Sequence, residues 1–429
     1  MRVLYLVTRT DEPGGAQVHV RDLACRLAED GHQVRVASGP PMASDYRAFL
    51  EAAGVQTREV PHLLRPIRPR ADLAALGEIT RLLREEAPDL VSLHSSKAGW
   101  LGRLAARRAR VPCVFTAHGW SFAAGVPPLR ARLYRLAERL TAGLCTAIIT
   151  VSDADRRLAL GARLARPERI VTVHNGMPDA DTARRPHPAL EGEAIRTVMV
   201  ARFTEQKDHP TALSAMARIA EWTAEEATGV RMVEEPEDGG AAEGDTAGST
   251  AVPEENRAPA GQTASGEPAP PPPAVPVELV LVGDGPTEYA MRRLAYDLGI
   301  DDRVRFLGSR SDVPEVLAAC DLCLLATKWE GLPRSIIEAL RAGLPVVATD
   351  LAGIPELVTH GDNGYLVDRG DVAELAEALW RLVGDEETRM RMGARARERY
   401  EEEFTFERMY LRTVAVYERV LGPGRGTAG

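Results

Sequence analysis

The feature that most constrains the fold is a regular alternation of short apolar runs and amphipathic segments. The runs VLYLVT and QVRVAS are separated by AQVHVRDLACRLAEDG, whose apolar residues recur at helical spacing. A strand that is buried on both faces reads as a continuous apolar run, and a helix between two such strands allows them to be parallel. The pattern therefore predicts α/β architecture, with parallel sheets covered by helices on both faces.

The alternation stops and then restarts near the middle of the chain. Residues 181–193, DTARRPHPALEGE, are polar and show no periodicity, and the pattern resumes at IRTVMVARF. This predicts two doubly wound domains, over residues 1–182 and 194–402. Residues 403–429 are expected to form a last helix, able to cross back to the first domain, and a tail.

One stretch within the second domain has a different composition. Residues 221–276 contain twelve Asp or Glu and two Arg, a net charge of −10, although the whole chain carries only −9. The stretch is also rich in Pro, Gly and Ala, and such a sequence cannot bury enough apolar surface to fold. We therefore expect a disordered insertion at about 226–275. Because the rest of the chain is nearly neutral, general nucleic-acid binding is not expected.

The sequence gives little sign of export, of disulfides or of a metal site. The N-terminus lacks the long apolar run of a signal peptide, so a cytoplasmic location is expected. Cys320 and Cys323 lie in the apolar run AACDLCLLA, which predicts a buried strand rather than a redox or metal pair. Asp153 and Asp155 are interpreted as N-terminal caps of a helix beginning near Asp155. No metal ligand is predicted.

The stretch EGLPRSIIEAL, residues 330–340, places Glu330 and Glu338 around a Gly-Leu-Pro turn. Pro333 suits the first turn of a helix, where free backbone N–H groups form an anion site. At about 1.5 Å per helical and about 3.5 Å per extended residue, the carboxylates lie on the order of 10–15 Å apart, enough to flank a diphosphate. A nucleotide sugar carries hydroxyls on both sides of its diphosphate. A surface pair between Glu338 and Arg334 is the alternative interpretation.

A second signal is ARFTEQKDHP, residues 201–210, which follows an expected buried strand. Ligands of doubly wound folds bind at strand ends, and Arg202 and Lys207 supply a forked donor and an ammonium there. Solvated surface charge is the alternative. The position favours two cations that hold a diphosphate.

Taken together, these motifs resemble those of the large retaining glycosyltransferase family 4, which has the GT-B fold. The resemblance implies two Rossmann-like doubly wound α/β domains that face each other across a cleft. The motifs follow the family's order along nearly the whole chain, and the acidic insertion is the main departure. They are E-x7-E at Glu330 and Glu338, R-x4-K at Arg202 and Lys207, GDGP from Gly283, GG at Gly14 and Gly15, HSSKAG from His94, TAHG from Thr116 and HNG from His174.

The resemblance implies a role for each matching residue in binding the donor. Arg202 and Lys207 would hold the leaving diphosphate, and Glu338 would accept hydrogen bonds from the ribose. Glu330 would position the donor sugar together with backbone groups. The base would lie beside VRFLG, although Phe306 is equally explained as a core residue. The other implied donor positions are Gly331, Leu332 and Gly283. His118 matches a catalytic residue near the transferred sugar; a lone histidine is more often structural, but the position of His118 in TAHG after the run CVFTA favours the catalytic role.

The acceptor side is carried by weaker motifs in the first half of the chain. Gly-Gly lets a backbone approach a ligand closely but is also a common turn. Hydroxyl and ammonium groups in HSSKAG suit a hydroxylated or phosphorylated acceptor. The implied acceptor residues are Gly14, Gly15, Ser95, Lys97 and Asn175.

Arginines on the first half suggest a membrane partner. A solvated arginine-rich helix face is the alternative, because no exposed aromatic row accompanies them. If they meet an anionic membrane, the acceptor could be lipid-linked and the enzyme would lie at the inner face of the plasma membrane. These residues are Arg65, Arg68, Arg70, Arg130, Arg132, Arg135 and Arg139.

The expected reaction is transfer of a sugar from a UDP- or GDP-sugar to a sugar or lipid-linked acceptor in polysaccharide, envelope or glycolipid assembly. Fixed cations and helix-end amides stabilise the charge that develops on a diphosphate leaving group, so neither a metal nor another cofactor is required. The resemblance implies retention of anomeric configuration. A nucleotide-sugar epimerase or hydrolase and a non-catalytic binding protein are the alternatives. A nicotinamide dehydrogenase is disfavoured because no strand precedes G-x-G-x-x-G.

Overall fold

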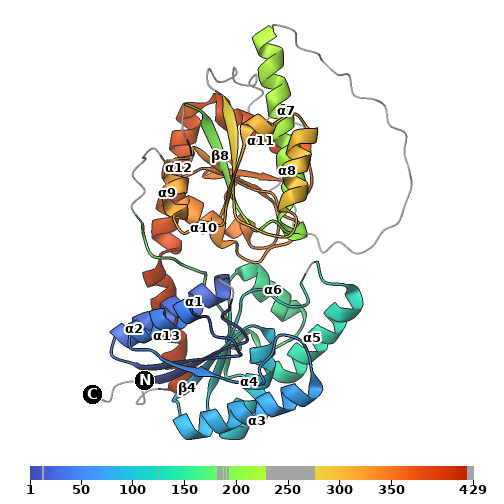
Figure 1. Ribbon diagram of the computed structural model, residues 1–429. Coiled ribbons are helices and arrows are strands. Elements are labelled where there is room, and N and C mark those ends of the chain that lie inside the picture. Colours follow the sequence, from blue (N-terminus) through green and yellow to red (C-terminus); the bar gives the residue numbers. More distant parts are fainter. Residues whose placement is uncertain are drawn as a thin grey trace.

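The computed structural model describes residues 1–11, 14–123, 125–180, 187, 190, 193–228 and 276–422. Strands and helices alternate in two α/β domains, drawn one above the other in Figure 1. The acidic insertion was predicted to start at about residue 226, and helix α7 (His209–Thr228) continues through Thr228. The rest of the predicted insertion, residues 229–275, lies outside the described residues.

The first domain is built on a seven-stranded sheet in which every pairing is parallel. The strand order is β3-β2-β1-β4-β5-β6-β7, so the chain reverses its direction of winding between β1 and β4. This is the doubly wound arrangement that the alternation predicts. The strands are β1 (Arg2–Val7), β2 (Gln33–Ser38), β3 (Gln56–Glu59), β4 (Leu90–His94), β5 (Cys113–Ala117), β6 (Ala147–Thr150) and β7 (Ile170–Thr172).

Helices cover both faces of this sheet because its central strands are apolar on both sides. One core cluster joins the sheet to α3, α4, α5 and α6, and the other joins it to α1, α2 and the last helix of the chain, α13 (Phe406–Leu421). Strand β4 is buried at every position, as a central parallel strand should be. The first six helices are α1 (Gly15–Glu29), α2 (Ser44–Ala52), α3 (Pro69–Glu86), α4 (Ser96–Ala109), α5 (Pro128–Ala142) and α6 (Asp153–Gly161).

The second domain repeats the plan with six parallel strands in the order β10-β9-β8-β11-β12-β13. Its reversal of winding lies between β8 and β11, which are hydrogen-bonded neighbours. Ligands in open α/β sheets bind outside the carboxyl ends of the strands at such a reversal. The strands are β8 (Ile195–Val200), β9 (Val277–Val282), β10 (Val304–Gly308), β11 (Leu322–Leu325), β12 (Val346–Thr349) and β13 (Gly364–Val367).

The helices of the second domain bury one continuous apolar core around this sheet. Cys320 and Cys323 belong to that core, Cys323 within β11, which confirms the buried-strand prediction; all five cysteines of the chain are free and buried. Besides α7, the helices are α8 (Glu288–Asp297), α9 (Val313–Ala318), α10 (Arg334–Arg341), α11 (Val372–Gly384) and α12 (Glu386–Glu403).

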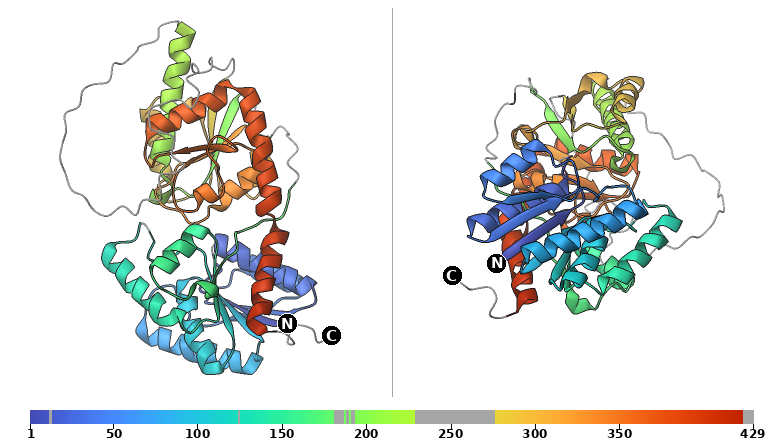
Figure 2. Two further views of the ribbon diagram at one scale, coloured as in Figure 1. Left: turned by 180° about the vertical axis from the view of Figure 1, so that it is seen from behind. Right: turned by 60° about the horizontal axis from the view of Figure 1, so that its bottom comes forward.

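The last helix, α13 (Phe406–Leu421), returns to the first domain and packs against its sheet. Figure 2 shows α12 and α13 running one after the other along the back of both domains. Tyr417 of α13 is fully buried and hydrogen-bonds Ser92 of β4 at 2.9 Å. The chain therefore passes between the domains twice, and Met177 on the first passage pairs with Thr405 on the second. Among the described residues, no helix is long and apolar enough to cross a membrane.

Candidate active site

Two loops meet at the carboxyl end of the second sheet and bring Lys207 against Glu330. Lys207 ends the short 3-10 helix η2 (Glu205–Lys207) after β8, and Glu330 follows β11. The Lys207 ammonium contacts Oε1 of Glu330, and Thr327 donates a hydrogen bond to the same oxygen at 3.2 Å. The side chains of Lys207 and Glu330 are 16% and 8% exposed. Two residues that were each predicted to contact the donor are thus adjacent, at the strand ends where a ligand is expected.

Arg202 follows the end of β8 by two residues and is exposed. The turn after β9 packs directly on this strand end, because a Cβ at Gly283 would lie 2.1 Å from the carbonyl oxygen of Ala201. Gly285 meets Phe203 in the same way, at 2.4 Å, and both glycines have positive φ. Only glycine allows this approach, so the GDGP motif shapes the loop that carries Arg202.

Helix α10 begins immediately after Pro333, as EGLPRSIIEAL predicts. The first N–H groups of a helix have no partner within it, so an anion is favoured in front of α10. Glu338 lies on the second turn, and burial raises the pKa of its carboxyl group, against the charges of Arg334 and Arg341. Phe306 is partly buried and lies 5.9 Å from Phe203 between ring centroids. This packing agrees with the core interpretation of Phe306.

The start of α10 contacts the first domain. A Cβ at Gly15 would lie 3.2 Å from Cδ of Arg334, and a Cβ at Gly331 would lie 3.9 Å from the carbonyl oxygen of His118. Nη1 of Arg334 is buried and has no hydrogen-bond partner among the described residues. The GG, TAHG and E-x7-E motifs, far apart in sequence, therefore converge at one interdomain boundary. A site between the domains is what the resemblance implies, but Arg334 was not predicted as part of it.

His118 ends a buried chain of hydrogen bonds within the first domain. Nδ1 of His94 lies 2.9 Å from Nε2 of His118, and Nε2 of His94 lies 3.0 Å from Oγ of Ser92. His19 stands edge-on to His118 with ring centroids 4.7 Å apart. Ring nitrogens of the three histidines lie within 4.8 Å of one another. Because those of His94 are already hydrogen-bonded, we do not assign the cluster as a metal site.

This cluster predicts a loss of stability in mild acid. Burial lowers the pKa of His19, His94 and His118, that of His118 to about 4. The unfolded chain, with histidine pKa values of about 6.5, then binds protons between about pH 6.5 and 4 that the folded domain does not. Stability should therefore fall as the pH drops through this range. Asp155 and Glu338 have the opposite slope, because burial raises the pKa of both, that of Asp155 to about 6, but His209 adds a fourth histidine, whose pKa burial lowers to about 4.

The measurement is the melting temperature of wild type and of His19→Asn between pH 7.5 and 5. The melting temperature of wild type should fall with pH, and the variant should show a shallower fall because one neutral buried imidazole is gone. Equal slopes in the two proteins would contradict this account of the cluster.

The predicted acceptor residues do not all face the interdomain boundary. Oγ of Ser95 lies 2.6 Å from Oγ1 of Thr8, and Asn175 is buried beside His19. The Lys97 ammonium donates to the carbonyl oxygens of Leu64 and Pro66 at 2.6 and 2.5 Å. It also forms an ion pair with Asp72 at 2.5 Å, so its charge is balanced within the first domain. This geometry favours a structural role for Lys97 over the predicted acceptor role.

A carboxylate of the second domain caps a helix of the first. Glu356 accepts hydrogen bonds at 2.7 Å from the backbone N–H groups of Asp153 and Ala154, at the start of α6, and lies 2.9 Å from Nε2 of His174. The prediction that Asp153 and Asp155 cap this helix is wrong. The cap is Ser152, whose Oγ accepts from the backbone N–H of Asp155. The first turn also receives the carboxylate from the facing domain, which no local pattern reveals.

Replacing Glu356 with alanine should loosen this contact. The amides of Asp153 and Ala154 lose a charged acceptor, a change of about 1–2 kcal/mol, so their hydrogen exchange should quicken about tenfold. Exchange mass spectrometry of peptides that span the start of α6 measures this. Glu377→Ala, which removes an exposed carboxylate from α11, is the matched control. Unchanged exchange in Glu356→Ala would show that the contact does not hold the domains together.

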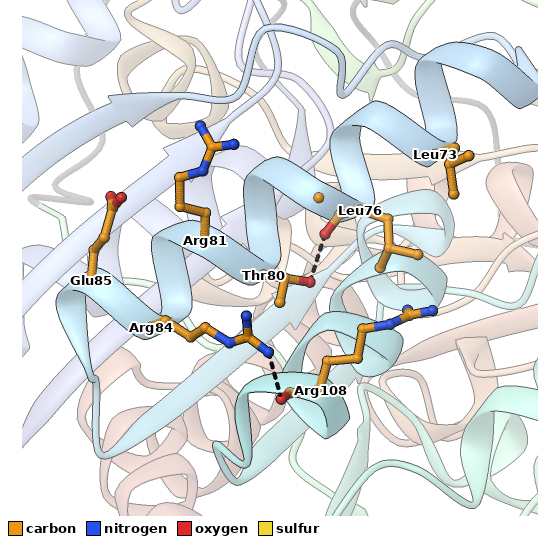
Figure 3. A pocket seen from close by; sticks show the side chains of 8 residues that line it. Leu73, Leu76, Thr80, Arg81, Arg84, Glu85 and Arg108 are labelled. Atoms are coloured by element: carbon orange, nitrogen blue, oxygen red, sulfur yellow. Dashed lines mark hydrogen bonds between the residues drawn. The ribbon is translucent and has the colours of Figure 1, made fainter.

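A surface groove between α3 and α4 lies away from these motifs. It is lined by apolar atoms and by arginines, and Nη2 of Arg84 donates to the carbonyl oxygen of Arg108 across it (Figure 3). None of its lining residues follows the carboxyl end of a strand, so it is not the predicted donor site. The lining residues are Leu73, Leu76, Gly77, Thr80, Arg81, Arg84, Glu85 and Arg108.

Several known proteins are similar to this chain in sequence, over part or most of its length. A 41% identical stretch of 147 residues matches an N-acetyl-alpha-D-glucosaminyl L-malate synthase of Bacillus anthracis but spans only 34% of this chain and 39% of that protein. A UDP-Gal:alpha-D-GlcNAc-diphosphoundecaprenol alpha-1,3-galactosyltransferase of Escherichia coli is 27% identical over 76% of this chain and 74% of its own length. A 2-deoxystreptamine glucosyltransferase of Streptomyces kanamyceticus is 28% identical over 82% of this chain and 83% of its own length.

The fold and the family follow from the remaining comparisons. The structure of Anabaena Alr3699/HepE in complex with UDP and glucose superposes with a TM-score of 0.71 at 21% identity, over 97% of this chain and 99% of that one. The architecture is therefore GT-B, as expected. Residues 13–181 match the family described as Glycosyltransferase Family 4, and residues 273–399 match Glycosyl transferases group 1. This chain, with one match in each domain, belongs to glycosyltransferase family 4.

Proposed function

We propose that this glycosyltransferase transfers a sugar from a nucleoside diphosphate sugar to a glycan or lipid-linked acceptor, with retention and without a metal. The observation that carries the proposal is the position of Lys207 and Glu330 beside the start of α10, where Arg334 meets Gly15 and the preceding loop meets His118 of the other domain. The pyrophosphate would lie between the side chains of Lys207 and Arg202 and the start of α10. The acceptor would enter from the first domain.

The chemistry that this arrangement supports is stabilisation of a departing diphosphate. Cleavage at the anomeric carbon builds positive charge on the sugar and negative charge on the leaving group. Lys207 and Arg202 offset the negative charge, and the amides at the start of α10 add further donors without reorganisation. Glu330, which holds Lys207 in place before the donor arrives, would then face the sugar. In this scheme the leaving phosphate itself takes the proton of the acceptor, so no dedicated protein base is assigned.

The relatives favour an acceptor from glycoconjugate assembly. One relative by its name acts on a diphosphoundecaprenol-linked sugar, and another glycosylates 2-deoxystreptamine. We propose the former class for this chain, because exposed arginines on the first domain suit an anionic membrane that presents a lipid-linked acceptor. The donor is proposed to be a UDP- or GDP-sugar.

A donor screen tests the proposal. The melting temperature of wild type is measured with UDP, GDP and their common sugar conjugates. One nucleotide series should raise it, and Glu338→Ala should weaken binding of that series about tenfold or more, because a charged hydrogen-bond acceptor for the ribose is lost. Equal affinity of wild type and Glu338→Ala would remove the ribose assignment. Epimerisation or rapid hydrolysis of the bound donor without acceptor would instead favour the epimerase or hydrolase alternative.

A further inference from the structure

Helix α5 carries a row of four leucines on the surface of the first domain. Their exposed fractions are 71% for Leu129, 59% for Leu133, 53% for Leu136 and 70% for Leu140. We call these four residues the leucine stripe. A surface helix normally turns its apolar stripe toward the core, so exposed leucines in such a row indicate a surface that meets a partner.

The orientation of α5 is fixed by its opposite face. Ala131, Glu138 and Ala142 are buried, and at about 100° per residue their row lies about 170° from the centre of the leucine stripe. Glu138 accepts hydrogen bonds at 2.7 Å from both Arg103 and Trp100 of α4. The helix is therefore anchored through a buried ion pair, and this anchor keeps the leucines outside.

The surface around the leucine stripe is basic. Arg130, Arg132, Arg135 and Arg139 of α5 are all exposed, whereas Glu138, the one acidic residue of the helix, is buried. Figure 1 and Figure 2 show the N-terminal end of α3 beside α5. That end adds two more exposed apolar residues, Ile67 and Leu73, next to three exposed arginines, Arg65, Arg68 and Arg70.

Two occupants fit an apolar row, and the charges decide between them. The spacing of four, three and four residues is that of a heptad seam, which a second copy of α5 could pair with. In such a pair, Arg130, Arg132 and Arg139 would flank the seam and would face the same arginines of the other copy. The helix has no exposed acidic residue that could offset this repulsion. An anionic lipid surface takes up both the leucines and the arginines.

We infer that the leucine stripe docks the first domain on an anionic bilayer. The inference deepens the proposed function and rests on it for its purpose, since a lipid-linked acceptor lies in such a surface. The stripe also begins close to the interdomain boundary. Leu129 follows Gly125 by four residues, and a Cβ at Gly125 would lie 2.6 Å from the Trp329 ring, directly before Glu330. Docking would therefore bring the lipid surface to the side of the proposed donor site.

Vesicle co-sedimentation of the full chain tests the inference, with phosphatidylcholine vesicles that contain or lack phosphatidylglycerol. Wild type should bind the anionic vesicles, and the double variant Leu133→Gln/Leu136→Gln should lower the partition coefficient at least about tenfold, because two side chains no longer enter the interface. Leu411→Gln, which changes a leucine of α13 that is 56% exposed, is the matched control and should bind as wild type does. Arg132→Gln/Arg139→Gln should reduce the dependence of binding on salt.

The outcomes separate the rival occupants. Equal binding by wild type and by Leu133→Gln/Leu136→Gln, or no binding of wild type to anionic vesicles, would overturn the inference. A wild-type dimer in sedimentation velocity that the double variant abolishes would also overturn it, in favour of a second copy of α5. The test uses no sugar donor. A failure here therefore leaves the donor screen standing, and a failed donor screen leaves vesicle binding intact.

Discussion

Lys207→Ala is expected to lower kcat for sugar transfer about 100- to 1,000-fold, the usual cost of removing one preorganised group that stabilises developing charge. The effect has two sources. The departing diphosphate loses a cation, and Glu330, only 8% exposed, loses the ammonium that it contacts. Its carboxylate would then repel the diphosphate. Lys207→Arg should recover only part of the rate, because arginine restores the positive charge but carries it on a planar guanidinium instead of a compact ammonium.

Steady-state kinetics with the donor found in the screen measures this effect. Arg391→Ala, which removes an exposed cation from α12 of the same domain, is the control and should leave kcat unchanged. A melting temperature of Lys207→Ala close to that of wild type would exclude unfolding as the cause. A kcat of Lys207→Ala within tenfold of wild type would contradict the role assigned to this lysine.

The largest expected effect on stability comes from Glu138→Ala. Arg103 and Glu138 form an ion pair with side chains 0% and 1% exposed, and the Arg103 guanidinium also lies 3.9 Å from the centre of the Phe115 ring. Removing the carboxylate leaves a buried guanidinium without its counter-charge. Breaking a buried pair in this way costs about 3–5 kcal/mol of the free energy of unfolding.

Because the chain has two domains, its unfolding need not be two-state, so hydrogen exchange of α4 and α5 is the suitable measurement. Both helices should lose protection in Glu138→Ala while helices of the second domain keep theirs. The double variant Arg103→Met/Glu138→Leu, which removes both charges, should recover much of the protection. If α4 and α5 in Glu138→Ala were as protected from exchange as in wild type, α5 would be held by other contacts.

The parallel sheets and the donor-side motifs could be predicted because local patterns determine them. Continuous apolar runs identify strands that are buried on both faces, and the polar residues that follow them fall at the carboxyl ends of those strands. Lys207 and Glu330 meet for this reason, since their strands β8 and β11 are neighbours in the sheet. Pro333 marks the start of α10 through its own backbone chemistry.

Contacts between the domains could not be predicted in this way. Glu356 reaches the start of α6 across some 200 residues, and Arg334 looks like one half of a helix-surface pair until Gly15 is placed beside it. Lys97 lies in a motif of the first domain, but its ammonium donates hydrogen bonds to carbonyl groups of a loop some 30 residues earlier in the sequence. The sequence shows the residue types at these positions but not the direction of each side chain.

Helix α5 shows a second limit of sequence patterns. Its leucines recur at helical spacing, and such a row ordinarily marks the buried face. Here the small residues Ala131 and Ala142 and the paired Glu138 form that face, so the leucines point outward. The inversion depends on Arg103 of a neighbouring helix, which the pattern within α5 does not reveal.

The central claim is that a pyrophosphate is bound where the start of α10 meets the first domain. A crystal structure with the nucleoside diphosphate selected by the donor screen tests it most directly. The claim predicts phosphate oxygens in hydrogen-bonding distance of Arg202, Lys207 and the first amides of α10, with the ribose at Glu338. A nucleotide bound elsewhere, or phosphates that contact neither cation, would contradict it.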